Sequence, residues 1–258
     1  MDEIDKKIIF NYLKDGRVSQ RDISTKLNIS PQALNYRVEK LLSIGIIKGF
    51  KTYVDERINN KNIGFAAYKN DIPFNDNIFL KITCLEELIV YGFAGKDTIN
   101  IRNEINKSCY GKPLMEYLPE NNLNYNISGN DRLIINELKK DPKIAVRDME
   151  SELNLTNAYI KRRINFFKEN GILNVLPVID LSKTDIVLFA LFSKKFEKIS
   201  DQFDDKLILK FSDKYSGIAI LFSMDMDNAK KLINKFRLID NELSIMIIYN
   251  YDFYSSNF

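Results

Sequence analysis

The hydrophobic and polar positions of residues 1–55 predict three helices followed by a strand. Apolar side chains recur from Ile4 to Leu13 with the spacing of one helix face. A second, shorter helix is expected to end at Leu27, and a third is expected to run from Pro31 to about Ile44. The apolar run Ile46–Val54, with a bend at Lys48-Gly49, is typical of a strand. Helix, helix, helix and strand in this order form a winged helix-turn-helix.

Capping residues support these boundaries. Asp2 is placed to cap the first helix, and Ser19-x-x-Asp22 resembles a capping box at the start of the second. Ser30 is expected to cap the third helix, with Pro31 at its first position, where a missing N–H costs nothing. Gly45 is expected to end that helix.

The same pattern recurs 126 positions downstream without a gap. Identical residues at this offset include Asp5 with Asp131, Ile8 with Ile134, Ile9 with Ile135, Arg37 with Arg163, and Gly45-Ile46 with Gly171-Ile172. The second copy predicts helices over 131–140 and 146–153, a third helix from Thr156 to Gly171, and a wing strand over 172–179. Winged helix-turn-helix units commonly bind double-stranded nucleic acid. A duplicated unit of this kind indicates a chain that contacts two segments of a duplex, or one that descends from such a chain.

The two remaining blocks predict strands and helices in alternation. Residues 181–258 show strands at 186–192, 207–211, 218–222 and 243–251 with helices at 194–203 and 225–237, the βαββαβ order of a ferredoxin-like domain. Residues 56–127 show strands at 64–68, 78–83, 88–93 and 114–118 and one helix at 97–109, so that the first helix of the pattern is missing. The fold class is therefore α+β, with domains at 1–55, 56–127, 128–180 and 181–258.

Composition excludes several classes of protein. The chain has no histidine, which removes imidazole-based acid/base catalysis, Ser-His and Cys-His nucleophiles and zinc sites that need imidazole. Cys84 and Cys109 are isolated, so we expect a reducing cytoplasm and neither a disulfide framework nor a metal site. No apolar run approaches the length of a membrane span. The net charge of +3 is small, and its positive excess lies in 1–55 and 128–180, where phosphate contacts would need it.

The two third helices carry the candidate DNA contacts. Leu34, Val38, Leu41 and Leu42 form the inner face of the first, and Ile160, Ile164 and Phe167 that of the second. Asparagine and glutamine side chains pair with adenine in the major groove, whereas lysine and arginine contact phosphates or guanine. The lysines of the first wing are expected to touch phosphates. The full set of expected DNA-binding residues is Gln32, Asn35, Tyr36, Arg37, Lys40, Lys48, Lys51, Lys161, Arg162, Arg163 and Asn165.

A polar helix face has a simpler explanation, which is solvation. In the first copy the capped helix-turn-helix favours DNA contact over simple solvation. In the second copy the alternative, a third helix used for packing or protein contact, is more strongly favoured than in the first. The second wing reads Asn174-Val175-Leu176-Pro177 and indicates a buried strand rather than a basic one. The first copy is therefore expected to dominate DNA affinity.

Residues 1–55 resemble the DNA-binding domain of the Lrp/AsnC family of bacterial and archaeal transcription regulators. The residues that carry this resemblance are Asp2–Ile9, Asp15-Gly16-Arg17, Ser30-Pro31, Tyr36-Arg37-Val38, Leu41 and Gly45–Phe50. Residues 128–180 resemble it more loosely, and 181–258 is similar in pattern to the family's sensing and dimerisation domain. The resemblance implies a sequence-specific regulator that binds double-stranded DNA, needs no cofactor and responds in some members to a small-molecule effector. The family's glycine- and aspartate-bearing turn has no counterpart at Cys84–Glu87 or Ser212–Tyr215, so amino-acid sensing is not implied.

Two further questions stay open at this level. The halves 1–127 and 128–258 either pair within one chain as a pseudo-dimer, helped by a tether near 123–127, or associate as a homodimer of chains. The rival functions are a protein-interaction scaffold built from winged helices and, least favoured, an enzyme similar to a siroheme decarboxylase subunit. No phosphate-binding loop, nucleophile elbow or paired-carboxylate motif supports catalysis.

Overall fold

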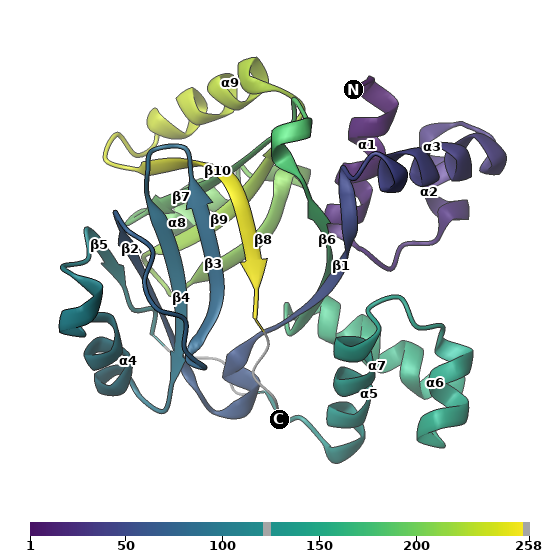
Figure 1. Ribbon diagram of the computed structural model, residues 1–258, viewed down its shortest axis with the longest axis horizontal. Helices are drawn as coiled ribbons and strands as arrows, with labels where there is room; N and C mark the ends of the chain where they lie inside the picture. Colours follow the sequence, from purple (N-terminus) through teal and green to yellow (C-terminus); the bar gives the residue numbers. More distant parts are fainter. Residues whose placement is uncertain (121–124, 255–258) are drawn as a thin grey trace.

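The computed structural model describes residues 1–120 and 125–254. Two three-helix heads lie on one side of the molecule, and an eight-stranded sheet with its covering helices lies on the other (Figure 1). The fold is α+β, as the sequence predicts. Part of the expected tether, residues 123–124, lies outside the described residues.

Each head forms from its own local signals. The first contains α1 (Glu3–Lys14), α2 (Gln20–Leu27) and α3 (Pro31–Ser43), and the second contains α5 (Gly129–Lys140), α6 (Val146–Leu153) and α7 (Asn157–Glu169). The side chains of Asp2, Ser19, Ser30 and Thr156 accept the expected capping hydrogen bonds from backbone N–H groups. Helix α5 begins two residues earlier than predicted, because Ser128 and Asp131 form a reciprocal capping box.

A glycine in the left-handed conformation follows the third helix of each head, α3 and α7, which we call the recognition helices. Gly45 follows α3 with φ +69° and Gly171 follows α7 with φ +67°. A residue with a Cβ is strained in this region, which explains why both copies have glycine here.

The wing strands of the two heads pair with each other. Strand β1 (Ile47–Val54) and strand β6 (Leu173–Ile179) form a two-stranded antiparallel sheet, with Phe50 opposite Pro177 and Lys51 opposite Leu176. At the 126-residue offset Phe50 corresponds to Leu176 and Lys51 to Pro177, so the register is symmetric about a local two-fold axis. The two wings therefore join the heads into one unit.

The remaining strands form one continuous sheet in the order β5-β2-β4-β3-β10-β7-β9-β8. One half contains β2 (Asn62–Tyr68), β3 (Ile78–Cys84), β4 (Ile89–Gly95) and β5 (Met115–Tyr117), with helix α4 (Thr98–Ile105). The other half contains β7 (Val187–Ser193), β8 (Leu207–Ser212), β9 (Gly217–Ser223) and β10 (Ser244–Phe253), with helices α8 (Phe196–Ser200) and α9 (Met226–Arg237). Short 3-10 segments lie at Glu56–Asn59, Ser108–Tyr110, Leu181–Lys183 and Asp204–Lys206.

The second half has the complete ferredoxin-like order, and the first lacks its first helix, as predicted. Residues 69–77, all of them described, contain bends and turns between β2 and β3 but no helix. Two predicted helices are shorter than expected. Helix α4 ends at Ile105 instead of Cys109, and α8 covers only Phe196–Ser200 of the expected 194–203.

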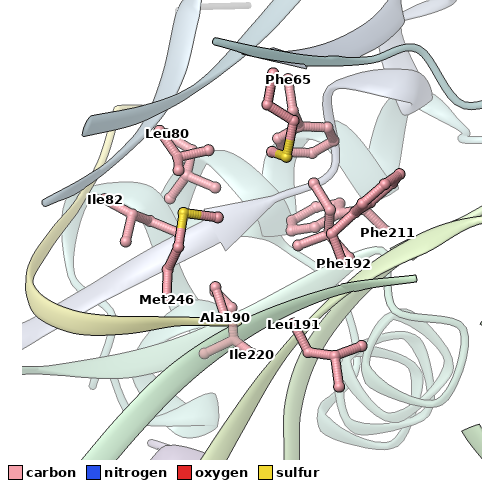
Figure 2. A pocket seen from close by; sticks show the side chains of 12 residues that line it. Phe65, Leu80, Ile82, Ala190, Leu191, Phe192, Phe211, Ile220 and Met246 are labelled. Atoms are coloured by element: carbon pink, nitrogen blue, oxygen red, sulfur yellow. The ribbon is translucent and has the colours of Figure 1, made fainter. Parts of the chain in front are cut away.

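Antiparallel pairing of β3 with β10 connects the two halves. The halves face each other across an apolar core, while α4 covers the outer face of one and α8 and α9 cover that of the other (Figure 1). Figure 2 shows this interior, where Phe65, Leu80, Phe211 and Met246 point toward one another from opposite halves. The remaining cavity of about 10 Å³ is only enough for one water molecule. The space between the halves is therefore filled by side chains.

Candidate nucleic-acid interface

The outer face of α3 is exposed to solvent. Gln32, Asn35 and Lys40 are exposed, and the ring of Tyr36 is 68% exposed. The Asn35 side-chain amide donates to the Glu39 carboxylate over 2.8 Å, which orients both groups along the helix surface. This face has the polar donors and acceptors that base edges require.

The inner face of α3 packs as predicted, with one exception. Leu34, Val38 and Leu41 are buried against α1 and α2. Leu42 is 43% exposed, so its predicted burial is wrong. The helix turns by 100° per residue, which carries Leu42 past the edge of the buried stripe that Leu41 occupies.

The outer face of α7 is also exposed, with a different chemistry. Lys161, Arg162 and Asn165 are exposed, and the Arg162 guanidinium lies 5.4 Å from the centre of the Tyr159 ring. Ile160 and Phe167 are buried beneath them, and Ile164 is half-buried against the same core. The second head thus presents a basic face where the first presents a neutral one.

Arg37 and Arg163 are engaged inside their own heads. Arg37 Nη1 lies 2.6 Å from Asp2 and 2.7 Å from Asp5, and Arg163 Nε lies 2.6 Å from Asp131. Hydrogen bonds from the Asp5 backbone N–H and from Arg37 lower the pKa of Asp2. Burial opposes ionisation of Asp131, but the bonds from Arg163 and Ser128 outweigh it and lower the pKa of that carboxyl. Each arginine therefore ties its recognition helix to the first helix of the head.

The lysines of the first wing also have partners within the protein. Lys48 Nζ lies 3.1 Å from Asp180, and Lys51 Nζ lies 3.1 Å from Asp252. Both lysines keep about half of their side-chain surface exposed, so the ion pairs are weak ones. In the second wing Val175, Leu176 and Pro177 are buried, which confirms that this strand serves packing.

Contacts between the heads extend beyond the wing strands. The Arg17 guanidinium donates to the carbonyl oxygens of Pro142 and Ile144, each over 2.7 Å. Lys168 forms a 2.6 Å ion pair with Asp15. These contacts fix how the recognition helices stand relative to each other, and sequence reasoning missed them. The 126-residue repeat marks Asp15 and Arg17 as part of the turn after α1, but it does not say that these turns meet.

The Lys143 ammonium strengthens the same junction. It bonds to the Gly16 carbonyl oxygen and lies 4.5 Å from the centre of the Phe50 ring and 5.1 Å from that of Tyr12. A lysine above two aromatic faces is stabilised by the ring quadrupoles, whose faces are partially negative. Burial lowers the pKa of Lys143.

One wide hollow of about 610 Å³ opens between the second head and the free edge of β8. Three of its four cationic side chains bind within the protein, and the fourth, Lys210, is exposed. Lys14 Nζ donates to the Leu207 carbonyl oxygen over 2.8 Å, Lys168 pairs with Asp15, and Arg57 binds Asp55. Within residues 1–120 and 125–254, no group of three or more cysteine or acidic side chains is arranged to hold a metal ion.

Comparison with known proteins agrees with this geometry. A family model described as a winged helix-turn-helix DNA-binding domain matches residues 1–48 and, separately, residues 127–174. Both matched segments coincide with the heads. An uncharacterised HTH-type transcriptional regulator of Pyrococcus abyssi is 40% identical over 65 residues, which are 25% of this chain and 42% of that protein. The chain contains two winged helix-turn-helix units that are similar to those of HTH-type transcriptional regulators.

Named regulators show a similar identity over a slightly shorter length. The HTH-type transcriptional regulator LrpC of Bacillus subtilis is 40% identical over 57 residues, 22% of this chain and 40% of LrpC. The regulatory protein AsnC of Haemophilus influenzae is 39% identical over 57 residues, 22% of this chain and 38% of AsnC. The chain thus matches less than half the length of these curated relatives.

A solved structure shares the whole architecture. The crystal structure of the siroheme decarboxylase NirDL aligns with 99% of this chain and 94% of its own, at a TM-score of 0.50 and 11% identity. At this identity the likeness concerns the fold alone. None of the described helices is long and apolar enough to cross a membrane.

Proposed function

We propose that this protein is a sequence-specific regulator of transcription that binds double-stranded DNA through α3 and α7. One observation carries the proposal. Both recognition helices bury an apolar face in their own heads and leave the opposite polar face open, at corresponding positions of the two copies. Such a helix is the part of a helix-turn-helix that enters the major groove.

The exposed residues divide between base and phosphate contacts. Asn35 and Gln32 have the paired donor and acceptor that match adenine, and they lie on the N-terminal half of α3. Lys161 and Arg162 carry charge toward phosphates, and Arg162 has the fork that matches guanine. Lys40 and Asn165 complete the two surfaces. Because Arg37 and Arg163 are bonded to α1 and α5, we assign them to positioning the helices and not to the duplex.

We propose that a single chain supplies both heads to one duplex. The β1–β6 and β3–β10 pairings are made within one polypeptide, so no second chain is needed to hold the heads that carry α3 and α7 in one unit. Light scattering with and without a short duplex measures the mass of the complex. A mass of one chain per duplex supports this pseudo-dimer, and a mass of two chains supports a homodimer.

We propose a binding protein and not an enzyme. The curated relatives are transcriptional regulators, and the chain contains no histidine. The relatives are bacterial and archaeal, which supports placing the protein with the DNA in a prokaryotic cytoplasm.

Footprinting of the protein on its own promoter region tests the function. We expect a protected segment at low salt and steep loss of protection as salt rises, because phosphate contacts release counterions. The double variant N35A/Y36A should still bind but with less preference for the footprinted sequence. The control variant K194A/K198A, with one lysine in the turn before α8 and one within α8, should bind as the unaltered protein does, because these exposed lysines lie outside the heads. Absence of protection at low salt would leave a protein-interaction scaffold as the better account.

A further inference from the structure

We propose that the target of this protein is a non-palindromic duplex with two unlike half-sites, one read by α3 and the other by α7. The inference rests on the proposed DNA binding and adds the kind of site that is bound. It follows from a contrast between the positions that the two heads share and the positions in which they differ.

Positions that build the heads are preserved at the 126-residue offset. The buried Ile8 and Ile9 correspond to Ile134 and Ile135, and the two Asp–Arg pairs that tie the third helix to the first are identical. The caps Ser30 and Thr156 keep a hydroxyl, and the glycine that ends the helix is the same in both copies. The two helices are therefore presented by equivalent frameworks.

Positions on the outward faces have diverged. Gln32 corresponds to Ala158, Asn35 to Lys161, Tyr36 to Arg162 and Glu39 to Asn165, and all eight residues are exposed. None of these four pairs keeps its chemical character. Packing does not require the change, because these side chains lie outside the core. The divergence therefore falls on the residues that would meet base edges.

The two faces suit different sequences. The amide groups of Gln32 and Asn35 match the N6 and N7 edge of adenine, while the ring of Tyr36 offers apolar contact to a thymine methyl. The Arg162 guanidinium matches the O6 and N7 edge of guanine, and Lys161 reaches guanine or phosphate. We therefore expect an A/T-rich half-site for α3 and a half-site containing guanine for α7.

The junction between the heads fixes the spacing and direction of the two half-sites. Antiparallel pairing of β1 with β6, with Lys51 opposite Leu176, leaves one register. Arg17 and Lys168 add contacts on either side of it. In a dimer of identical chains, two-fold symmetry of the protein is matched by a palindromic site. Here the heads and their paired wings keep two-fold symmetry, but the outward faces of α3 and α7 do not. The protein therefore binds its site in one direction only.

Selection from a pool of random duplexes tests the inference with the full chain. We expect the enriched sequences to share two different half-sites at one spacing and one relative orientation. Enrichment of a palindrome would overturn the inference while leaving DNA binding in place. Absence of any enrichment would overturn the proposed function itself.

A transplant of the α3 surface onto α7 gives a sharper result. The variant A158Q/K161N/R162Y/N165E changes only exposed positions, so its unfolding should match that of the unaltered protein. We expect it to select a site in which the α3 half-site occurs twice with two-fold symmetry. On the original site its affinity should fall about tenfold or more, because the α7 base contacts are lost.

The control variant K194N/K198N, with one lysine in the turn before α8 and one within α8, also loses two positive charges and should select the original site. If the transplanted protein also selected the original site, α7 would read no bases, and the inference would be wrong.

Discussion

Gly16 donates its backbone N–H to the carbonyl oxygen of Val175 over 2.8 Å. The turn after α1 of the first head is thereby bonded to the wing strand of the second. A Cβ added to Gly16 would lie 2.5 Å from that oxygen, closer than such atoms approach. The contact shows why glycine is needed at this turn. A substitution of Gly16 therefore tests the junction between the heads directly.

Replacing Gly16 with alanine should weaken the docking of the heads. The Val175 backbone must shift to admit the new methyl group, and overpacking of this kind costs about 1–3 kcal/mol. Urea unfolding followed by circular dichroism measures the loss. The matched control is G129A at the start of α5, where an added Cβ meets nothing within 4 Å. That variant should be unchanged or more stable by up to about 1 kcal/mol, and equal destabilisation of both variants would contradict the assignment.

Arg162 and Arg163 are neighbours in sequence with separate roles, which a pair of single variants should separate. In R163A the Asp131 carboxylate, only 2% exposed, loses its cationic partner, and we expect a loss of about 3 kcal/mol in the free energy of unfolding. In R162A the lost side chain is exposed, so stability should change by no more than about 0.5 kcal/mol. DNA affinity should respond in the opposite order at temperatures where both variants are folded. Equal stability of the two variants would show that the Arg163–Asp131 pair does not hold the helix.

Acid should destabilise the heads through the same carboxylates. The pKa of Asp131 is lowered in the folded state by Arg163 and Ser128 against the effect of burial. A lowered pKa means that the stability conferred by the group is complete above its ordinary pKa of about 4 and is lost as pH falls through the folded value. We therefore expect a loss of stability below about pH 4, and a shallower dependence in D131N. Urea midpoints at neutral and acid pH check this, and parallel curves for the two proteins would contradict it.

The cationic residues of α7 and the lysines of the first wing should differ in their effect on the salt dependence of DNA affinity. Lys161 and Arg162 have no carboxylate partner among the ion pairs of the described residues, whereas Lys48 and Lys51 pair with Asp180 and Asp252. Each free phosphate contact contributes a slope of about −0.9 to the logarithm of affinity against that of salt. Titrations at several salt concentrations should show a slope shallower by about 1 for K161A/R162A, which loses the Lys161 phosphate contact, and by more if Arg162 also contacts a phosphate. The slope for K48A/K51A should change less, and the reverse order would place the wing closer to the duplex than we propose.

Much of each head could be predicted from sequence because its signals are local. The Asp2, Ser19, Ser30 and Thr156 caps bond to N–H groups within three residues, so their effect does not depend on distant parts of the chain. The error at Leu42 arose at the edge of an apolar stripe, where one position of helical rotation separates a buried residue from an exposed one. The helix at 194–203 was predicted too long because a helical pattern alone does not specify where a short helix stops.

Only part of the candidate DNA-binding site could be predicted from the sequence. Exposure of Asn35, Tyr36, Lys161 and Arg162 follows from helical periodicity. The ion pairs of Arg37 and Arg163 do not, because their partners lie 32 residues away in another helix. An arginine on a recognition helix looks the same in sequence whether it faces a phosphate or a carboxylate.

By itself the sequence determined two heads, their caps and glycine stops, the βαββαβ order and the divergence of the two reading surfaces, because each depends on residues close in the chain or on comparison at a fixed offset. Only the tertiary structure decided that β1 pairs with β6 and β3 with β10. Several strands have similar apolar patterns, and any free edge offers the same backbone donors and acceptors. The choice among them depends on which surfaces pack together once the whole chain is folded.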